Sequence, residues 1–118
     1  MSSPQQPLNE SGNVTLDGSG NGTLSMKPWG GGVTWQPQVV SVKASSNTSE
    51  ASAKIYIGPE AADQYYVDGT LSGSTGDSTT NVAGYSVDTH GNTLWVVWEG
   101  GDAGATATAQ VNGTMVTP

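Results

Sequence analysis

Cysteine, arginine and phenylalanine are all absent from this 118-residue chain, and only three lysines carry positive charge. Without cysteine the chain has neither disulfide bonds nor thiolate metal sites, and this absence favours synthesis in the cytoplasm. The net charge of −7 leaves no cationic surface to neutralise phosphate groups. The sequence therefore predicts no nucleic-acid partner and no anionic membrane surface as a partner.

Large aliphatic side chains are also scarce, since leucine, isoleucine and valine together supply 19 residues. With the net charge, this composition approaches that of disordered chains. Four tryptophans and four tyrosines shift the balance back, because each aromatic side chain buries a large area. We expect a folded domain with a lean core, which takes part of its stability from self-association or from a host surface. The chain has neither an apolar run long enough for a membrane helix nor the pattern of a signal peptide.

The order of the chain predicts one β domain behind a short arm. Residues 1–12 are polar, contain two prolines and are expected to form an extended, flexible N-terminal arm, with residues 13–118 as a single domain. No segment has a sustained helical period, and short apolar runs are separated by glycine and asparagine. We therefore predict an antiparallel β-sandwich or jelly-roll-like barrel of about seven to eight strands.

Individual segments support more local predictions. A glycine loop between two alternating runs predicts a β-hairpin over residues 13–27, and Pro37 marks an edge or a bulge in its strand. One helical turn is expected before Tyr65, and a loop is expected over residues 74–81. Further strands are predicted at residues 33–43, 54–58, 82–88 and 93–99.

The last third of the chain has the clearest period. From Ala103 to Val111 every odd position is alanine or valine, whereas the even positions from Thr106 onward are polar. This alternation predicts a strand whose inner face is almost all methyl groups. Such small side chains leave space that Trp95 or Trp98 of the preceding strand can fill. Because these tryptophans point to opposite faces, one is expected in the core and the other in an intermolecular contact.

Exposed aromatic side chains are the main candidates for binding. Trp29 precedes three glycines and is expected at the edge of a flexible loop, whereas Trp35 is expected in the core. An exposed loop tryptophan anchors a protein interface, stacks on a sugar ring or folds back over its own sandwich. The candidate interface residues are Leu8, Trp29, Trp35, Trp95 and Trp98.

No arrangement of catalytic residues is found in the sequence. His90 is the only histidine, stands in a predicted turn and has no Gly-x-Ser-x-Gly motif to accompany it. The loop that begins at Asp17 lacks the spaced carboxylates and closing glutamate of an EF-hand, and no phosphate-binding glycine loop is present. We therefore expect a protein that is not an enzyme, with no catalytic residue, no metal site and no cofactor.

Three stretches carry a resemblance to a known family. They are "KIYIG", a later "DG", and "HGNTLWVVWEGGDAGATATAQVNG". Together they resemble small all-β virion structural proteins, capsid decoration or tail-associated, of tailed phages of actinobacteria, over about residues 33–113. The resemblance implies a module carried on the virion, assembled in the host bacterial cytoplasm, and supplies no catalytic residue.

Two functions follow from these features as expectations. The first is a non-enzymatic capsid decoration protein that docks on the major capsid protein or another virion protein, on the capsid surface. By analogy with many virion decoration proteins, such a chain is expected to form a homo-oligomer, with a trimer favoured. The alternative is a carbohydrate-binding module of a phage tail or a secreted bacterial protein, with Trp29 and either Tyr65 or Tyr66 as the sugar platform. A sugar platform needs coplanar exposed rings beside hydrogen-bonding groups, whereas docking needs a continuous apolar patch.

Overall fold

The computed structural model describes residues 5–45, 51–72 and 78–117, and this part of the chain is dominated by β-strands. A single 3-10 turn, η1 (Asp63–Tyr65), stands where the sequence predicts a helical turn. The eight strands are β1 (Gln5–Thr15), β2 (Gly22–Met26), β3 (Thr34–Ala44), β4 (Ala51–Gly58), β5 (Tyr66–Ser72), β6 (Ser78–Asn81), β7 (Thr93–Glu99) and β8 (Thr106–Val116).

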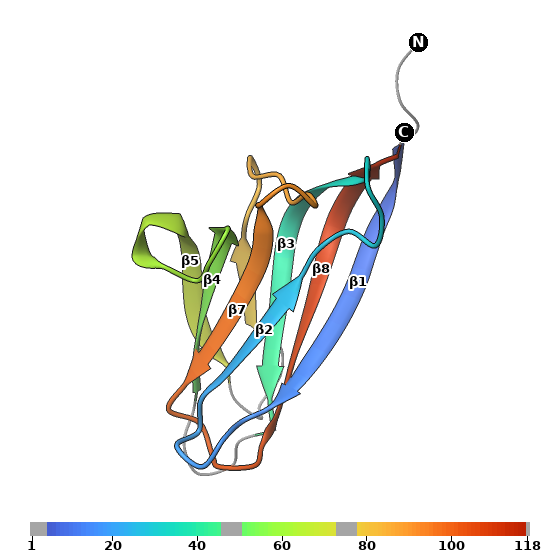
Figure 1. The fold of residues 1–118 in the computed structure, drawn as a ribbon. Coiled ribbons are helices and arrows are strands. Elements are labelled where there is room, and N and C mark those ends of the chain that lie inside the picture. Colours follow the sequence, from blue (N-terminus) through green and yellow to red (C-terminus); the bar gives the residue numbers. More distant parts are fainter. Residues whose placement is uncertain (1–4, 46–50, 73–77, 118) are drawn as a thin grey trace.

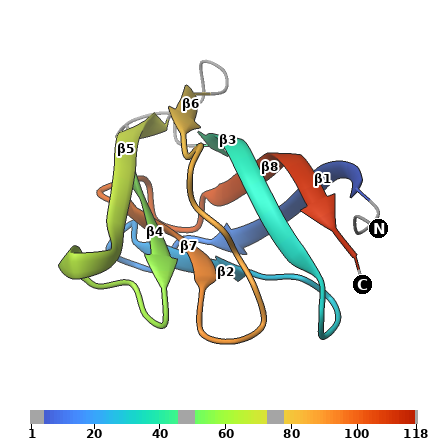
Figure 2. The ribbon, with the colours of Figure 1, turned by 90° about the horizontal axis from the view of Figure 1, so that it is seen from above.

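The strands form two four-stranded antiparallel sheets that pack face to face (Figure 1). Sheet A has the order β1-β8-β3-β6, and sheet B has the order β2-β7-β4-β5. Successive strands therefore cross repeatedly from one sheet to the other, which is the connectivity of an eight-stranded jelly roll. Seen from above, β1 and β2 lie along one side of the sandwich and β5 and β6 along the other (Figure 2). The predicted all-β sandwich is confirmed.

The core lies between the sheets, and in β7 and β8 it is built from alternate residues of the strand. In β7 these are Leu94, Val96 and Trp98, all without exposed area, whereas the residues between them are less deeply buried. In β8 they are the alanines and Val111, as the alternation predicts, although Ala103 itself is exposed in the turn before the strand. The largest fully buried side chains are Trp98, Leu8, Leu16, Ile55, Leu94, Val40, Val42, Val82, Val87, Val96, Val111 and Pro37.

The expected N-terminal arm differs from the structure at residues 5–12. These residues belong to β1, which pairs with β8 along its whole length, from Gln5 opposite Val116 to Thr15 opposite Thr106. Leu8 is only 2% exposed and belongs to the core. The polar composition reflects the outward residues of an edge strand, and one buried leucine with a full ladder of backbone pairs suffices to hold it in the sheet. Residues 1–4 lie outside the described residues.

The hairpin expected over residues 13–27 does not form within one sheet. The segment over residues 13–27 leaves sheet A at Thr15 and enters sheet B at Gly22, so β1 and β2 do not pair with each other. In the same way β7 and β8 lie in different sheets, and the tryptophan strand faces the alanine strand across the core. A glycine-rich turn permits either a hairpin or a corner between sheets, so the local signal could not separate them.

Several local predictions also have a clear outcome. Pro37 does mark a bulge, because the pairing of β3 with β8 shifts between Pro37 and Val39, but β3 is an inner strand of its sheet. The strand expected at residues 82–88 is reduced to one bridge between Val87 and Trp35. The expected loop over residues 74–81 contains β6, while positions 74–77 fall outside the described residues.

Candidate functional site

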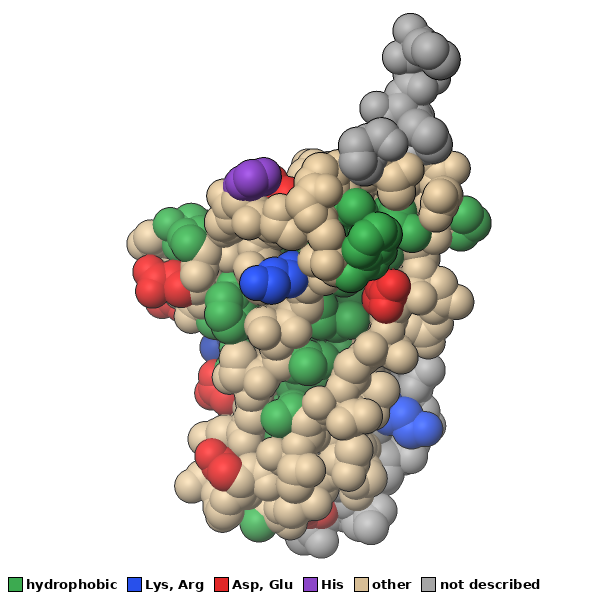
Figure 3. All heavy atoms as spheres, turned by 45° about the vertical axis from the view of Figure 1, so that its right-hand side comes forward, with side chains coloured by type: hydrophobic (Ala, Val, Ile, Leu, Met, Phe, Trp, Pro, Cys, Tyr) green, Lys and Arg blue, Asp and Glu red, His purple; other side chains and the backbone are tan. Residues whose placement is uncertain are grey.

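A groove of about 310 Å³ opens where the two sheets meet along β1 and β2. Each of these strands pairs on one side only, so their free edges face the same side of the molecule. The lining residues are Glu10, Ser11, Gly12, Leu24, Ser25, Met26, Lys27, Trp29 and Trp35. Figure 3 shows hydrophobic side chains gathered on this side of the molecule, with an acidic and a basic side chain beside them. We call this site the Trp29 groove.

The Trp29 groove is closed at one end and open at the other. At Gly12 the two edge strands touch through a side chain, because a Cβ placed there would lie 3.2 Å from Leu24 Cδ1. Beyond this contact the lining continues to Lys27 and Trp29, in the connection that follows β2. Met26 and Trp35 are buried and form an apolar floor. The groove is therefore a pocket for a compact group rather than a channel for a continuous chain.

Trp29 is the most exposed large hydrophobic side chain among the described residues, at 76%. It follows the buried Pro28 and precedes three consecutive glycines, of which Gly32 has a φ of +82°. The turn is closed by the Val33 N–H, which donates to the Gly30 carbonyl over 3.3 Å. The loop thus holds the indole ring at the rim of the groove, and the ring does not fold back over the sandwich.

The outer faces of the two sheets differ in character. On sheet A the outward residues of the β1–β8 pair are polar, and Gln110 Nε2 donates to Asn9 Oδ1 over 2.7 Å. On sheet B the outward residues of β7 include Trp95 and Val97, both half-buried. Trp95 pairs in register with Tyr56 of β4. Over β1 and β8 sheet A therefore has the largely polar outer face of a solvated sheet, and Val39 of β3 is an exposed aliphatic side chain on the same face. Sheet B carries an aromatic and aliphatic strip along β7.

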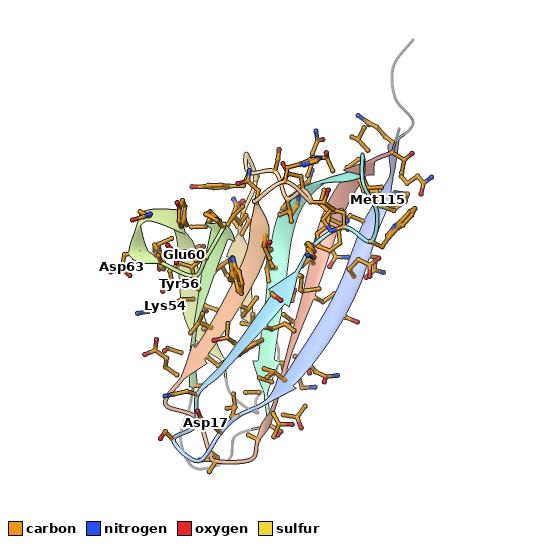
Figure 4. All side chains as sticks on the ribbon, viewed as in Figure 1. Asp17, Lys54, Tyr56, Glu60, Asp63 and Met115 are labelled. Atoms are coloured by element: carbon orange, nitrogen blue, oxygen red, sulfur yellow. The ribbon has the colours of Figure 1, made fainter. Side chains whose placement is uncertain are left out.

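The connection between β4 and β5 covers part of this strip. The indole N–H of Trp95 donates to the Gly58 carbonyl over 3.0 Å. Tyr66, 47% exposed, stacks edge to face on Tyr56 with ring centroids 5.8 Å apart. The ring of Tyr65 lies directly over Gly58, since a Cβ there would come within 2.6 Å of Tyr65 Cδ1. Figure 4 shows Tyr56 beside this connection. Tyr56 is buried as a result, and Trp95 and Val97 remain only half-covered.

The five candidate interface residues fall into three groups. Leu8, Trp35 and Trp98 are buried in the core, and of these three Trp35 also lines the floor of the Trp29 groove. Trp95 lies on the outer face of sheet B, and Trp29 stands at the rim of its groove. Sequence reasoning missed Glu10 and Lys27 at the groove. The two walls of the groove come from β1 and β2, which belong to different sheets, and no local sequence pattern indicates that these strands lie side by side.

The two-ring sugar platform expected from sequence does not assemble. Trp29 follows β2, whereas Tyr65 and Tyr66 stand at the start of β5, and β2 and β5 are the two opposite edges of sheet B. Two whole strands therefore separate the rings. No tyrosine lines the Trp29 groove, so a ligand there meets Trp29 as its single exposed ring.

The carboxylate of Asp17, in the loop after β1, is hydrogen-bonded to the backbone of its own loop. Asp17 Oδ1 accepts hydrogen bonds from the backbone N–H groups of Ser19 and Asn21, over 2.8 and 3.0 Å. These two bonds, that of Asn21 above all, lower the pKa of Asp17. Within the described residues no group of three or more His, Asp or Glu side chains is placed to hold a metal ion. No helix in the described part is long and apolar enough to span a membrane.

Comparisons with known proteins give a likeness of fold. No protein-family model matches the chain, and no curated protein matches it. Among solved structures the chain is similar to the Yersinia pseudotuberculosis-derived mitogen, with a TM-score of 0.52 and 7% sequence identity. The match covers 91% of this chain and 86% of the mitogen chain. At this identity the likeness supports the β-sandwich architecture alone.

Proposed function

We propose that this chain is a non-enzymatic structural protein of a phage virion, most simply a capsid decoration protein that docks on the major capsid protein. The observation that carries the proposal is the contrast between the outer faces of the sheets. Sheet A is largely polar outside, with Val39 as an isolated exposed aliphatic residue, whereas sheet B presents the neighbouring Trp95 and Val97, only half-covered by the chain itself. A half-covered strip of this kind is typical of a protein-binding surface.

Three further features agree with this role. The jelly roll is a fold that viral capsid domains use widely, although lectin domains use it as well. The resemblance to virion proteins of actinobacterial phages runs through β7 and β8, the strands that carry the strip and the alanine row. The net charge of −7 keeps a glycine- and threonine-rich β protein soluble before assembly.

The proposed assembly is a homo-oligomer, with a trimer as its leading state, in which the strip on sheet B is covered by neighbouring subunits or by the capsid. Trp95 is the central anchor, since it lies between β2 and β4 in the middle of the sheet. Large, rigid aromatic side chains near the centre of an interface supply most of its binding free energy.

The experiment that tests this function is mass spectrometry of purified phage particles from a host that carries the gene. Particles purified through a density gradient should contain the chain in a constant ratio to the major capsid protein. Deleting the gene should remove that signal and lower the temperature at which the particles lose their DNA. Particles that lack the chain while the gene is expressed would contradict the proposal.

A matched pair of variants then tests the docking face. Trp95→Ala should reduce incorporation into particles, whereas Tyr85→Ala, at an exposed aromatic residue outside both sheets, should leave it unchanged. Equal incorporation of the two variants would place the docking surface elsewhere on the molecule.

A further inference from the structure

The Trp29 groove lies off the edge of sheet B and takes no part in the docking face argued above. The geometry points to a binding site for a neutral saccharide, in which one sugar ring stacks on Trp29 and its hydroxyl groups meet Glu10 and Lys27. This inference is independent of the proposed virion function. Of the two aromatic rings expected for a sugar platform, only Trp29 takes part. The polar walls of the groove take the place of the tyrosine ring.

The shape of the groove selects a compact ring. Its volume of about 310 Å³ is at the small end of the range for ligand pockets. The contact between Gly12 and Leu24 limits the groove at one end. The indole of Trp29 offers a broad apolar surface at the open end, onto which the C–H face of a sugar ring can pack.

The polar groups of the groove select a neutral ligand rich in hydroxyl groups. Glu10 on β1 supplies a hydrogen-bond acceptor, and Lys27 beyond the end of β2 supplies a donor. Ser11 and Ser25 can act as either. One carboxylate and one ammonium group leave the local charge balanced, so neither a polyanion nor a polycation is favoured.

The floor of the groove supplies a second observation. Trp35 is 3% exposed, and its indole N–H has no hydrogen-bond partner in the described part of the chain. A buried donor without a partner is destabilising, and most such groups in proteins are paired. This buried, unpaired donor belongs to a residue that lines the floor of the groove.

The test is titration of the purified chain with a panel of free neutral oligosaccharides built from glucose, galactose, mannose, arabinose or N-acetylglucosamine. Binding is followed by tryptophan fluorescence and by calorimetry. At least one member should bind saturably and change the fluorescence of the exposed indole. Absence of saturable binding across the panel would overturn the inference, whatever the outcome of the particle experiment.

Variants then locate the site. Trp29→Ala and Glu10→Gln should each weaken the binding about tenfold or more, while Tyr85→Ala, a matched exposed aromatic residue, should not change it. Binding that survives Trp29→Ala unchanged would place the saccharide elsewhere and overturn the assignment of the groove.

Discussion

Ala107 and Ala109 have no exposed area and belong to the same buried cluster as Trp98, which projects from the opposite sheet. Ala107→Leu should therefore lower the free energy of unfolding by about 1–3 kcal/mol, because the added methyl groups have no space. The neighbouring Thr108→Leu, on the outer face, should change it little. Urea denaturation of the two purified variants measures the difference. Equal effects would mean that the two faces have been assigned wrongly.

Gly113 is fixed by the bulge of the neighbouring strand. A Cβ at this position would lie 2.9 Å from both the Gln38 nitrogen and the Pro37 Cα. Backbone atoms cannot move aside as a flexible side chain can, so Gly113→Ala should cost about 1–3 kcal/mol of stability. Gly18→Ala is the matched control, since nothing lies within 4 Å of its added methyl group. A melting temperature equally affected by both changes would argue against a steric role for Gly113.

At this scale the sequence predicted the inward and outward residues correctly wherever strict alternation was present. Trp95 and Trp98 were placed on opposite faces by parity alone, and the structure assigns Trp98 to the core. The alternation could not tell which of the two was buried, because every residue from Leu94 to Trp98 is apolar. That choice depends on which face of β7 packs against the alanines of β8, and this is determined by the tertiary structure.

Among the strands, β1 departs most from the sequence prediction. A polar segment with two prolines has the composition of an arm, yet it pairs with β8 over all of its length. Leu8→Ala should therefore cost about 2–5 kcal/mol, as for other buried leucines. Ser11→Ala, at an exposed position of the same strand, should stay within about 0.5 kcal/mol of the native chain. Two equally stable variants, measured by thermal melting, would support an arm instead.

The connection between β1 and β2 closes one end of the sandwich. Asn21 Oδ1 accepts from the Gly100 N–H over 3.1 Å, and the Gly101 N–H donates to the Gly20 carbonyl over 3.0 Å. Two connections that are far apart in the sequence are thus bonded to each other. Their glycines were visible in the sequence, but contacts between distant loops leave no periodic signal.

Asp17 makes this end of the molecule sensitive to acid. Its pKa is lowered in the folded chain by the backbone N–H groups of Asn21 and Ser19, so its contribution to stability is present above the unfolded-state pKa. That contribution is lost as the pH falls through the lower, folded-state pKa, below about pH 4. Asp17→Asn keeps an acceptor oxygen but has no proton to gain. Acid titration of stability should therefore be shallower for the variant, and identical titration curves would contradict this role.

For the whole molecule, the eight-stranded jelly roll could be predicted as a class but not as a topology. Turns rich in glycine and strands with period two indicate an all-β sandwich. The assignment of each strand to a sheet depends on pairings between segments far apart in the sequence, such as β1 with β8. The Trp29 groove depends on the same pairings, since its walls meet only because β1 and β2 end up as edges of different sheets.

The two tryptophans of β7 separate folding from assembly. Trp98→Ala removes the largest fully buried side chain and should cost about 3–5 kcal/mol, a large share of the stability of a lean domain. Trp95→Ala removes one hydrogen bond to Gly58 and a half-buried ring, so the isolated domain should lose less.

The oligomeric state provides the second measurement for this pair. If sheet B is the docking face, Trp95→Ala should shift the protein toward monomers in light scattering at a temperature where the domain stays folded. The contrary result would be that Trp95→Ala keeps the native oligomeric state but loses as much stability as Trp98→Ala. In that case the β4–β5 connection already covers the strip, because the Trp95 indole is bonded to Gly58 within the same chain. Docking would then have to use a different face of the sandwich.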